Sequence, residues 1–258
     1  GRITKITERN LEVWNRVLGH EVSDPLTAPM VYLSNSSVAD VLETLAGADR
    51  IANLQPAFSR GWDESIDRQR GYFDVSWGQP DSWKQAILQG PAFFVGTPFY
   101  KTVNKSMKHN QDWSMVDLET LAPDALPYTS YKPVPGKADY DSAYTHWGEN
   151  GEMPARDHFR LAWRAMAGNA NERTLISAVI PPETAHINGV FSVGLPQESS
   201  GTIRQLSAFV QSLLLDFSIR AAPKSGIYQS AFERLPCVQD HLLHGELEIR
   251  AARLNCLT

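Results

Sequence analysis

Side chains of the kinds that bind nucleic acids gather between residues 101 and 113. Lysine can contact phosphate groups, side-chain amides can read base edges, and tryptophan can stack on a base. No acidic residue precedes Asp112 in this stretch, so none opposes an anionic ligand there. We predict nucleic-acid contacts from Lys101, Lys105, Lys108, His109, Gln111 and Trp113. A solvated loop has a similar composition, so that interpretation also stays open.

A second group of basic residues surrounds a predicted β-hairpin. The stretches 158–166 and 173–182 read as strands joined by a turn-forming "AGNANE" segment. On the first strand, alternation places Arg160 and Arg164 on one face and Leu161 and Trp163 on the other. The pattern predicts a half-buried hairpin with a basic outer face, and we include four arginines among the DNA-binding candidates: Arg156, Arg160, Arg164 and Arg173. For Arg173, an ion pair with Glu172 or Asp157 is an equal alternative.

Catalytic and metal-binding motifs are missing from the sequence. No two glycines are separated by a single residue, which excludes the glycine-rich loops that bind dinucleotides and S-adenosylmethionine. "GVFSVG" (189–194) has one residue too many for a nucleophile elbow and is better explained as a strand with a β-bulge. "GENG" (148–151) has acidic flanks and predicts a turn. His241 and His244 lack a third ligand, so we expect no metal site. Because the catalytic motifs above are missing, we also expect no catalytic residue.

One enzymatic alternative remains open from the residues alone. Asp112 and Asp117 flank Trp113 and could act with His109 as the acidic pair of a small hydrolase. Loop caps and turn residues have the same appearance.

Composition narrows the class of protein. The chain has 258 residues and a formal net charge of -5, which argues mildly against a free-standing nucleic-acid binder but permits a local basic face. Two cysteines fit a reducing compartment, and we expect a cytoplasmic protein. No signal peptide or membrane-spanning segment is predicted. The abrupt start at Gly1 and the end at "RLNCLT" suggest a domain of a longer chain.

The hydrophobic periodicity predicts an α+β fold with a mixed β-sheet and a helical C-terminal part. Further strands are predicted at 29–33, 71–77, 92–100 and 186–196, and few regular elements between 101 and 151. Helices are predicted after Ser36 or Ser37, from Asp81, over 202–222 and over 238–254. We treat residues 1–258 as one domain, with a possible division into a strand-rich part (1–200) and a helical part (201–258).

Two segments resemble a known family. "RDHFRLAWRAMAGNANERTLISAVIPP" (156–182) and "FVQSLLLDFSIRAAPKSGIYQSAFERLP" (209–236) are similar to parts of the TaqI-like adenine methyltransferases, which include type IIG restriction–modification enzymes and the methylases of BREX and DISARM phage defence. Weaker similarities are found at 61–73 and 89–101. In that family, the segments belong to the target recognition domain.

The resemblance implies a module that positions double-stranded DNA so that an adenine can be flipped into a catalytic pocket elsewhere. The catalytic Asn-Pro-Pro-aromatic motif is absent, because Ile180 precedes Pro181 and Pro182, and Glu183 follows them. The implied partners are double-stranded DNA and a methyltransferase domain N-terminal to this chain, which would bind S-adenosylmethionine; other defence subunits are also possible. The rival hypothesis is a protein-interaction scaffold that docks such subunits.

Overall fold

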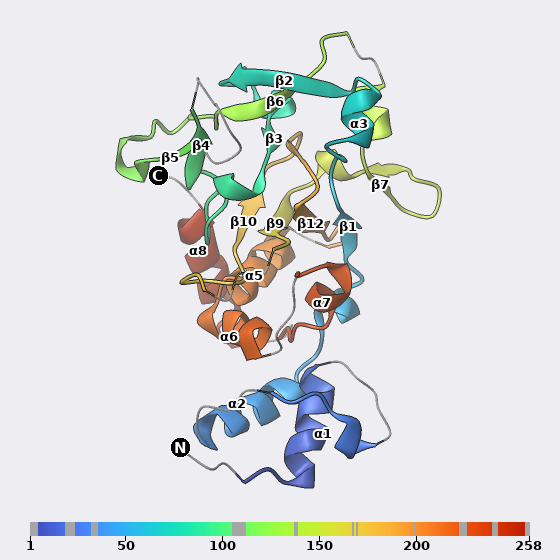
Figure 1. Cartoon of the computed structure of the whole chain (residues 1–258), viewed down its shortest axis with the longest axis vertical. Coiled ribbons are helices and arrows are strands. Elements are labelled where there is room, and N and C mark those ends of the chain that lie inside the picture. Colours follow the sequence, from blue (N-terminus) through green and yellow to red (C-terminus); the bar gives the residue numbers. More distant parts are fainter. Residues whose placement is uncertain are drawn as a thin grey trace.

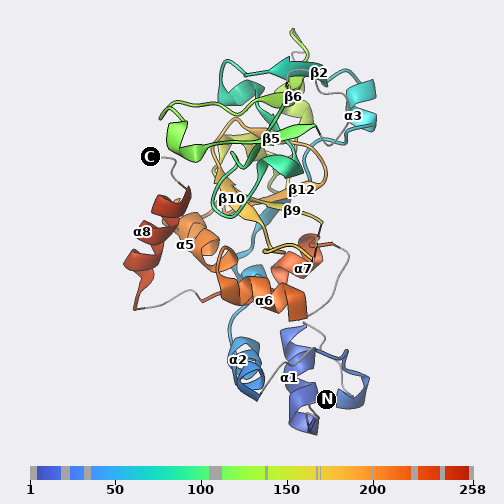
Figure 2. The ribbon, with the colours of Figure 1, turned by 60° about the vertical axis from the view of Figure 1, so that its left-hand side comes forward.

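The computed structural model describes residues 5–18, 24–31, 36–104, 112–136, 139–166, 168, 170–198, 200–221, 226–238 and 242–255. The fold is α+β, as predicted from the sequence. It has three tiers (Figures 1 and 2): two N-terminal helices at one end, a central sheet with helices in the middle, and a tier of short strand pairs at the other end.

A four-stranded antiparallel sheet forms the middle tier. Its strands lie in the order β1 (Ala57–Ser59), β12 (Val190–Gly194), β9 (Arg160–Arg164) and β10 (Ser177–Ile180). The predicted hairpin is confirmed, since β9 and β10 pair with Ser177 opposite Trp163. The predicted bulge in "GVFSVG" is wrong, because β12 pairs with β9 in unbroken register from Val190 to Val193.

Helices cover one face of this sheet. They are α5 (Ser200–Val210), α6 (Leu213–Ala221), α7 (Gln229–Glu233) and α8 (His244–Asn255), and α8 packs against α5 (Figure 2). Leu161, Trp163 and Val193 of the sheet pack into the same core cluster as Leu206 and Phe232. The rings of Trp163 and Phe232 are stacked with centroids 3.9 Å apart.

The single helix predicted over 202–222 is two helices with a break at Gln211 and Ser212. The carbonyls of both residues accept hydrogen bonds from Arg173 Nη2, at 2.8 and 3.1 Å. The Ser212 hydroxyl accepts from the backbone amide of Leu215 and so caps the start of α6. The apolar period continues through the break, so the period alone does not reveal it.

The opposite face of the sheet is buried as well. Ala162, Ala178 and Ile180 pack there against a layer that includes Leu88 and Phe93. The layer contains β3 (Ile87–Leu88), which pairs in parallel with β11 (Ala185–His186), so the structure has both kinds of strand pairing. The strand predicted over 92–100 is instead a turn with an isolated bridge between Phe94 and Thr97, and Gly96 takes a φ of 80° there.

In its described residues, the outer tier has three strand pairs and two short helices. The pairs are β2 (Phe73–Gly78) with β6 (Thr129–Pro133), β4 (Lys101–Val103) with β5 (Trp113–Met115), and β7 (His146–Trp147) with β8 (Met153–Pro154). The helices are α3 (Ile66–Gln69) and α4 (Tyr140–Ala143). The predicted "GENG" turn is confirmed between β7 and β8, where the Gly151 amide donates to the Gly148 carbonyl at 3.3 Å. Residues 101–151 therefore hold more regular structure than predicted.

The N-terminal tier contains α1 (Glu8–Val17) and α2 (Ser36–Ala46). Thr7 and Asn10 form a reciprocal capping box at the start of α1, a helix that the sequence analysis did not predict. Trp14 and Leu42 pack with Ala221 and Phe217 of α6, which attaches this tier to the middle one. Short 3₁₀ helices cover Pro25–Thr27, Ile51–Leu54, Trp83–Gln85, Gly90–Ala92, Leu118–Thr120 and Ala155–Asp157.

No helix in the described ranges is long and apolar enough to span a membrane.

Candidate nucleic-acid interface

Tyr100 occupies a fixed position where the outer tier meets the central sheet. Its backbone amide donates to the Ala92 carbonyl at 2.8 Å, and its carbonyl accepts from the Val116 amide at 3.1 Å. Its half-buried ring stacks on Phe94, with centroids 4.8 Å apart and planes 24° from parallel. The two rings therefore form a rigid, partly exposed aromatic pair.

One of the predicted DNA-binding cations, Lys101, lies over this tyrosine, and Arg164 lies close enough for the tyrosine to affect its pKa. Lys101 Nζ is 5.4 Å from the centroid of the Tyr100 ring, within the range of a cation–π contact. Arg164 is half-buried at the end of β9; burial lowers the pKa of its guanidinium, and the interaction with Tyr100 opposes that shift. Within the described residues, neither cation forms an ion pair with a carboxylate. Among the described residues, therefore, no carboxylate neutralises either charge.

Trp113 completes the group. It begins β5, pairs with Val103 of β4, and is half-buried against the same core cluster as Phe94. We call the five residues Phe94, Tyr100, Lys101, Trp113 and Arg164 the cation–aromatic patch. The structure thus brings together residues from the first predicted stretch and from the hairpin, which are about sixty positions apart in the sequence.

The remaining candidates of the first stretch lie outside the described residues: Lys105, Lys108, His109 and Gln111. Their DNA contacts stay a prediction.

The acidic residues beside the patch have structural partners. Asp112 accepts a hydrogen bond from the Asn104 side chain at 2.6 Å, and Ser114 donates to the same asparagine at 2.7 Å. Asp117 caps the 3₁₀ helix Leu118–Thr120 by accepting from the Glu119 amide. Asp117 is therefore a capping residue and Asp112 joins a side-chain network; a catalytic role for them with His109, which lies outside the described residues, stays a prediction.

The predicted basic outer face of the hairpin is wrong, because Arg160 is fully buried. Its guanidinium donates to the Thr184 carbonyl, and burial lowers its pKa. Arg156 is only 4% exposed and donates to the carbonyls of Glu183 and Lys84, at 2.7 and 2.8 Å. Arg156 also forms an ion pair with Asp141. Arg160 lies on the face of β9 that the outer tier covers, and Arg156 lies in the 3₁₀ helix before β9; alternation along one strand cannot indicate the burial of either.

Arg173 belongs to a buried polar network around Asp216. One carboxylate oxygen of Asp216 accepts from the backbone amides of Thr174 and Leu175, at 2.8 and 2.7 Å. Asp216 also lies 3.5 Å from Arg173 Nε and 3.0 Å from Arg220 Nε. Neither Glu172 nor Asp157, the two predicted partners, forms an ion pair with Arg173 among the described contacts. Sequence reasoning missed Asp216, although its place within the apolar run "LLLDFSI" was a signal of a buried, partnered acid.

This network joins the two segments that carry the family resemblance. Arg220 of the second segment donates to the carbonyls of Asn171 and Glu172 in the first, at 2.7 and 2.6 Å. The Trp163 indole in turn donates to the Ile227 carbonyl at 2.8 Å. The "NERT" turn is therefore held by α6, and both segments form one scaffold.

A histidine–serine pair lies inside the molecule. His186 Nε2 and Ser192 Oγ are 2.7 Å apart, and both residues are fully buried. Burial, assisted by the charge of Arg160, lowers the pKa of His186 to about 3. Gly61 packs so closely against His186 that a Cβ there would overlap it. The pair is inaccessible to a substrate, so its role is in packing.

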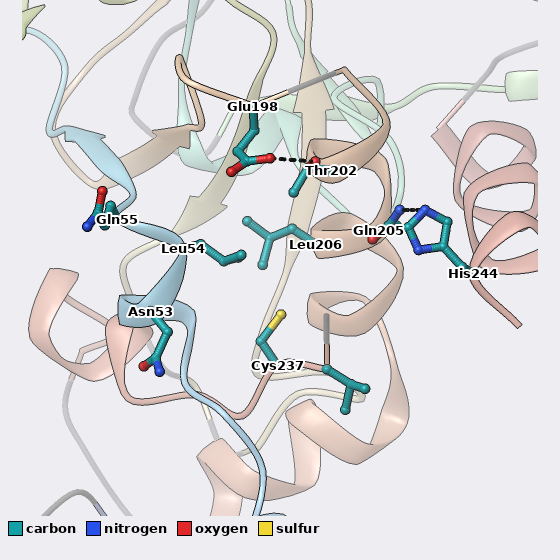
Figure 3. Close-up of a pocket in the computed structure, with 10 residues that line it drawn as sticks. Asn53, Leu54, Gln55, Glu198, Thr202, Gln205, Leu206, Cys237 and His244 are labelled. Carbon is teal, nitrogen blue, oxygen red and sulfur yellow. Dashed lines mark hydrogen bonds between the residues drawn. The ribbon is translucent and has the colours of Figure 1, made fainter. Parts of the chain in front are cut away.

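A separate pocket of about 300 Å³ lies between residues 53–55 and α5 (Figure 3). Leu54 and Leu206 face each other across it, and the buried Cys237 thiol, whose pKa burial raises to about 11, lies below them. No lysine or arginine is among its described lining residues, so it does not suit phosphate. The cation–aromatic patch is the better candidate for binding nucleic acid.

No metal-binding arrangement is present among the described side chains. His244 contacts Gln205 and lies 3.0 Å from Glu248, while His241 falls outside the described ranges. Within the part of the chain that the structure describes, no three His, Cys, Asp or Glu side chains form a group that could hold an ion.

No protein-family model matches the chain, and a comparison with curated proteins finds no match.

Proposed function

We propose that the chain is a sequence-specific DNA-recognition domain that serves an adenine-N6 DNA methyltransferase. The observation that carries the proposal is the cation–aromatic patch, where Lys101 lies over the half-buried Tyr100 ring, Phe94 stacks on that ring, and neither Lys101 nor Arg164 forms an ion pair with a carboxylate among the described residues. Cations contact phosphates and aromatic rings contact bases, and nucleic-acid sites commonly combine the two.

The scaffold around the patch supports the same function. The two segments that resemble target recognition domains are linked by the Asp216 network, and β9 of the first segment carries Arg164 at its end. Recognition residues placed on strands are held more precisely than residues on loops. In this proposal the chain binds and orients DNA, while methyl transfer from S-adenosylmethionine takes place in a separate domain.

The net charge of -5 shapes how such a domain meets DNA. Long-range attraction is weak, so a local face must neutralise the phosphates. If the face makes about four phosphate contacts, the slope of log affinity against log salt is roughly -3.6, and affinity falls on the order of 10²-fold between 50 and 200 mM salt. Fluorescence anisotropy with a labelled duplex, started at low salt, measures this slope. Absence of binding at the lowest salt would contradict the proposal.

Charge-reversal variants test where DNA binds. Lys101→Glu and Arg164→Glu should each reduce affinity, because each places a negative charge in the patch. Lys5→Glu is the matched control, since it changes the net charge equally at an exposed position in the N-terminal tier. Equal losses in patch and control variants would show that only net charge matters and would argue against the patch.

A domain exchange tests sequence recognition itself. Replacing the recognition domain of a related adenine methyltransferase with this chain should change the methylated sequence, as read by sequencing of the modified DNA. An active hybrid that keeps the original specificity would contradict the recognition role.

A protein-docking role is the second candidate, and one observation favours it. Met166 and Tyr228 are 77% and 56% exposed, and the bridge between Met166 and Gly226 brings their segments together. Exposed apolar side chains that lie together often mark a protein interface. A domain that shows no DNA binding at low salt would favour this candidate.

A further inference from the structure

We propose that the cation–aromatic patch binds an unpaired base stacked on Tyr100, so that its preferred ligand is DNA with an unstacked nucleotide. This inference rests on the proposed function and specifies the ligand of the same site. Paired bases in an intact duplex have their faces covered by neighbouring base pairs. Away from the ends of a duplex, only a base displaced from the stack offers a face to an aromatic ring.

The aromatic pair is prepared for such a contact. Phe94 covers one face of the Tyr100 ring at a centroid distance of 4.8 Å, and two backbone hydrogen bonds fix the position of Tyr100. The ring therefore needs little reordering when a ligand binds, which is the condition for a favourable stacking contact.

The Lys101 side chain covers the Tyr100 ring and can move away from it when a ligand binds. Its Nζ lies over the Tyr100 ring at 5.4 Å and has no carboxylate partner in the described part of the chain. A cation–π contact favours the covered arrangement by about two- to thirtyfold from exposed to desolvated sites, whereas base–aromatic stacking contributes roughly 5- to 150-fold in affinity. When the lysine turns to a phosphate, the exchange of cover for base is therefore favourable.

Arg164 supplies the second charge beside the same tyrosine. It lies half-buried at the end of β9, and a Cβ on Gly90, two residues before Ala92, whose carbonyl accepts a hydrogen bond from the Tyr100 amide, would lie 4.0 Å from its Nε. A nucleotide consists of a base and a phosphate, so a stacking ring with Lys101 over it and Arg164 in the same part of the fold, neither ion-paired with a carboxylate among the described residues, matches both parts. An intact duplex would contact the cations through its phosphates but would not stack a base on the Tyr100 ring.

Three labelled ligands test the inference with the whole chain: a duplex, the same duplex with one extra unpaired nucleotide, and a single strand. We expect the bulged duplex to bind at least about fivefold more tightly than the intact one at equal salt. Tyr100→Leu should abolish that ratio and Tyr100→Phe should keep it. Tyr228→Leu is the control at an exposed tyrosine outside the patch. Circular dichroism checks that each variant is folded.

The outcomes separate this inference from the proposed function. If none of the three ligands binds at low salt, the proposed function itself fails. If the intact duplex binds as well as the bulged duplex, and charge reversal at Lys101 and Arg164 weakens both equally, DNA binding stands and the stacked base is overturned. A bulge preference that survives Tyr100→Leu also overturns it.

Discussion

The Asp216 network and the cation–aromatic patch both contain cationic side chains, but their cations differ in whether a carboxylate pairs with them. Around Asp216, two arginines, one carboxylate and two backbone amides pair with one another or with nearby carbonyls. In the patch, Lys101 and Arg164 have no carboxylate partner among the described residues. An arginine's role in this protein therefore depends on its partners and its exposure rather than on its place in a motif.

Arg160 and Arg164 of β9 differ in burial in the same way as the network and the patch do. Arg160 and Arg164 lie on the same face of β9, four residues apart. The outer tier buries Arg160 completely, whereas Arg164 at the strand's end stays half-buried beside Tyr100. The boundary between the scaffold and the candidate interface therefore runs through a single strand.

The largest expected effect comes from breaking the Asp216 network. Asp216→Ala should lower the free energy of unfolding by about 3–5 kcal/mol, because it leaves two arginines without their counter-charge and two buried amides without an acceptor. Urea denaturation monitored by tryptophan fluorescence measures the loss. Glu246→Ala is the control, since it removes an exposed partner of Arg250 and should change stability by at most about 0.5 kcal/mol. A loss as small as that of the control would show that the network does not hold the fold.

The second effect is a pH dependence of stability that follows from the buried His186, and its size per pH unit is smaller than the loss expected for Asp216→Ala. Its pKa is about 3 in the folded protein and ordinarily about 6.5, so the unfolded chain binds one more proton between these values. The contribution of His186 to stability is complete above pH 6.5 and decreases as the pH falls towards 3, by up to about 1.4 kcal/mol per pH unit. Urea denaturation at a series of pH values measures this slope. His186→Gln should reduce it, and an unchanged slope would mean that other groups cause it.

The smallest effect on stability, with a clear effect on binding, is expected in the patch. Lys101→Met and Arg164→Met each remove a positive charge that pairs with no carboxylate among the described residues. The free energy of unfolding should therefore change by about 1 kcal/mol or less. If each side chain contacts one phosphate, each variant should reduce the magnitude of the salt-dependence slope by roughly 0.9. A large loss of stability with an unchanged slope would assign these residues to the scaffold and remove the contrast between the two regions.

The sequence by itself determined the α+β class, the β9–β10 hairpin, the "GENG" turn and the sides of β9 on which its residues lie. These features depend on local periodicity and turn chemistry, which neighbouring residues specify. The sequence also drew attention to Lys101, Trp113 and Arg164, which the fold brings to one place. It did not separate them from Arg156, Arg160 and Arg173.

Only the tertiary structure decided which cations are buried. A strand's alternation shows that two faces exist, but the outer tier that covers the second face of the sheet comes from segments far away in the chain. The same reason explains the break between α5 and α6, where Arg173 from a distant turn binds the carbonyls of Gln211 and Ser212. Burial and partnership are long-range properties, and they decide whether a charged side chain belongs to the scaffold or stays available to a ligand.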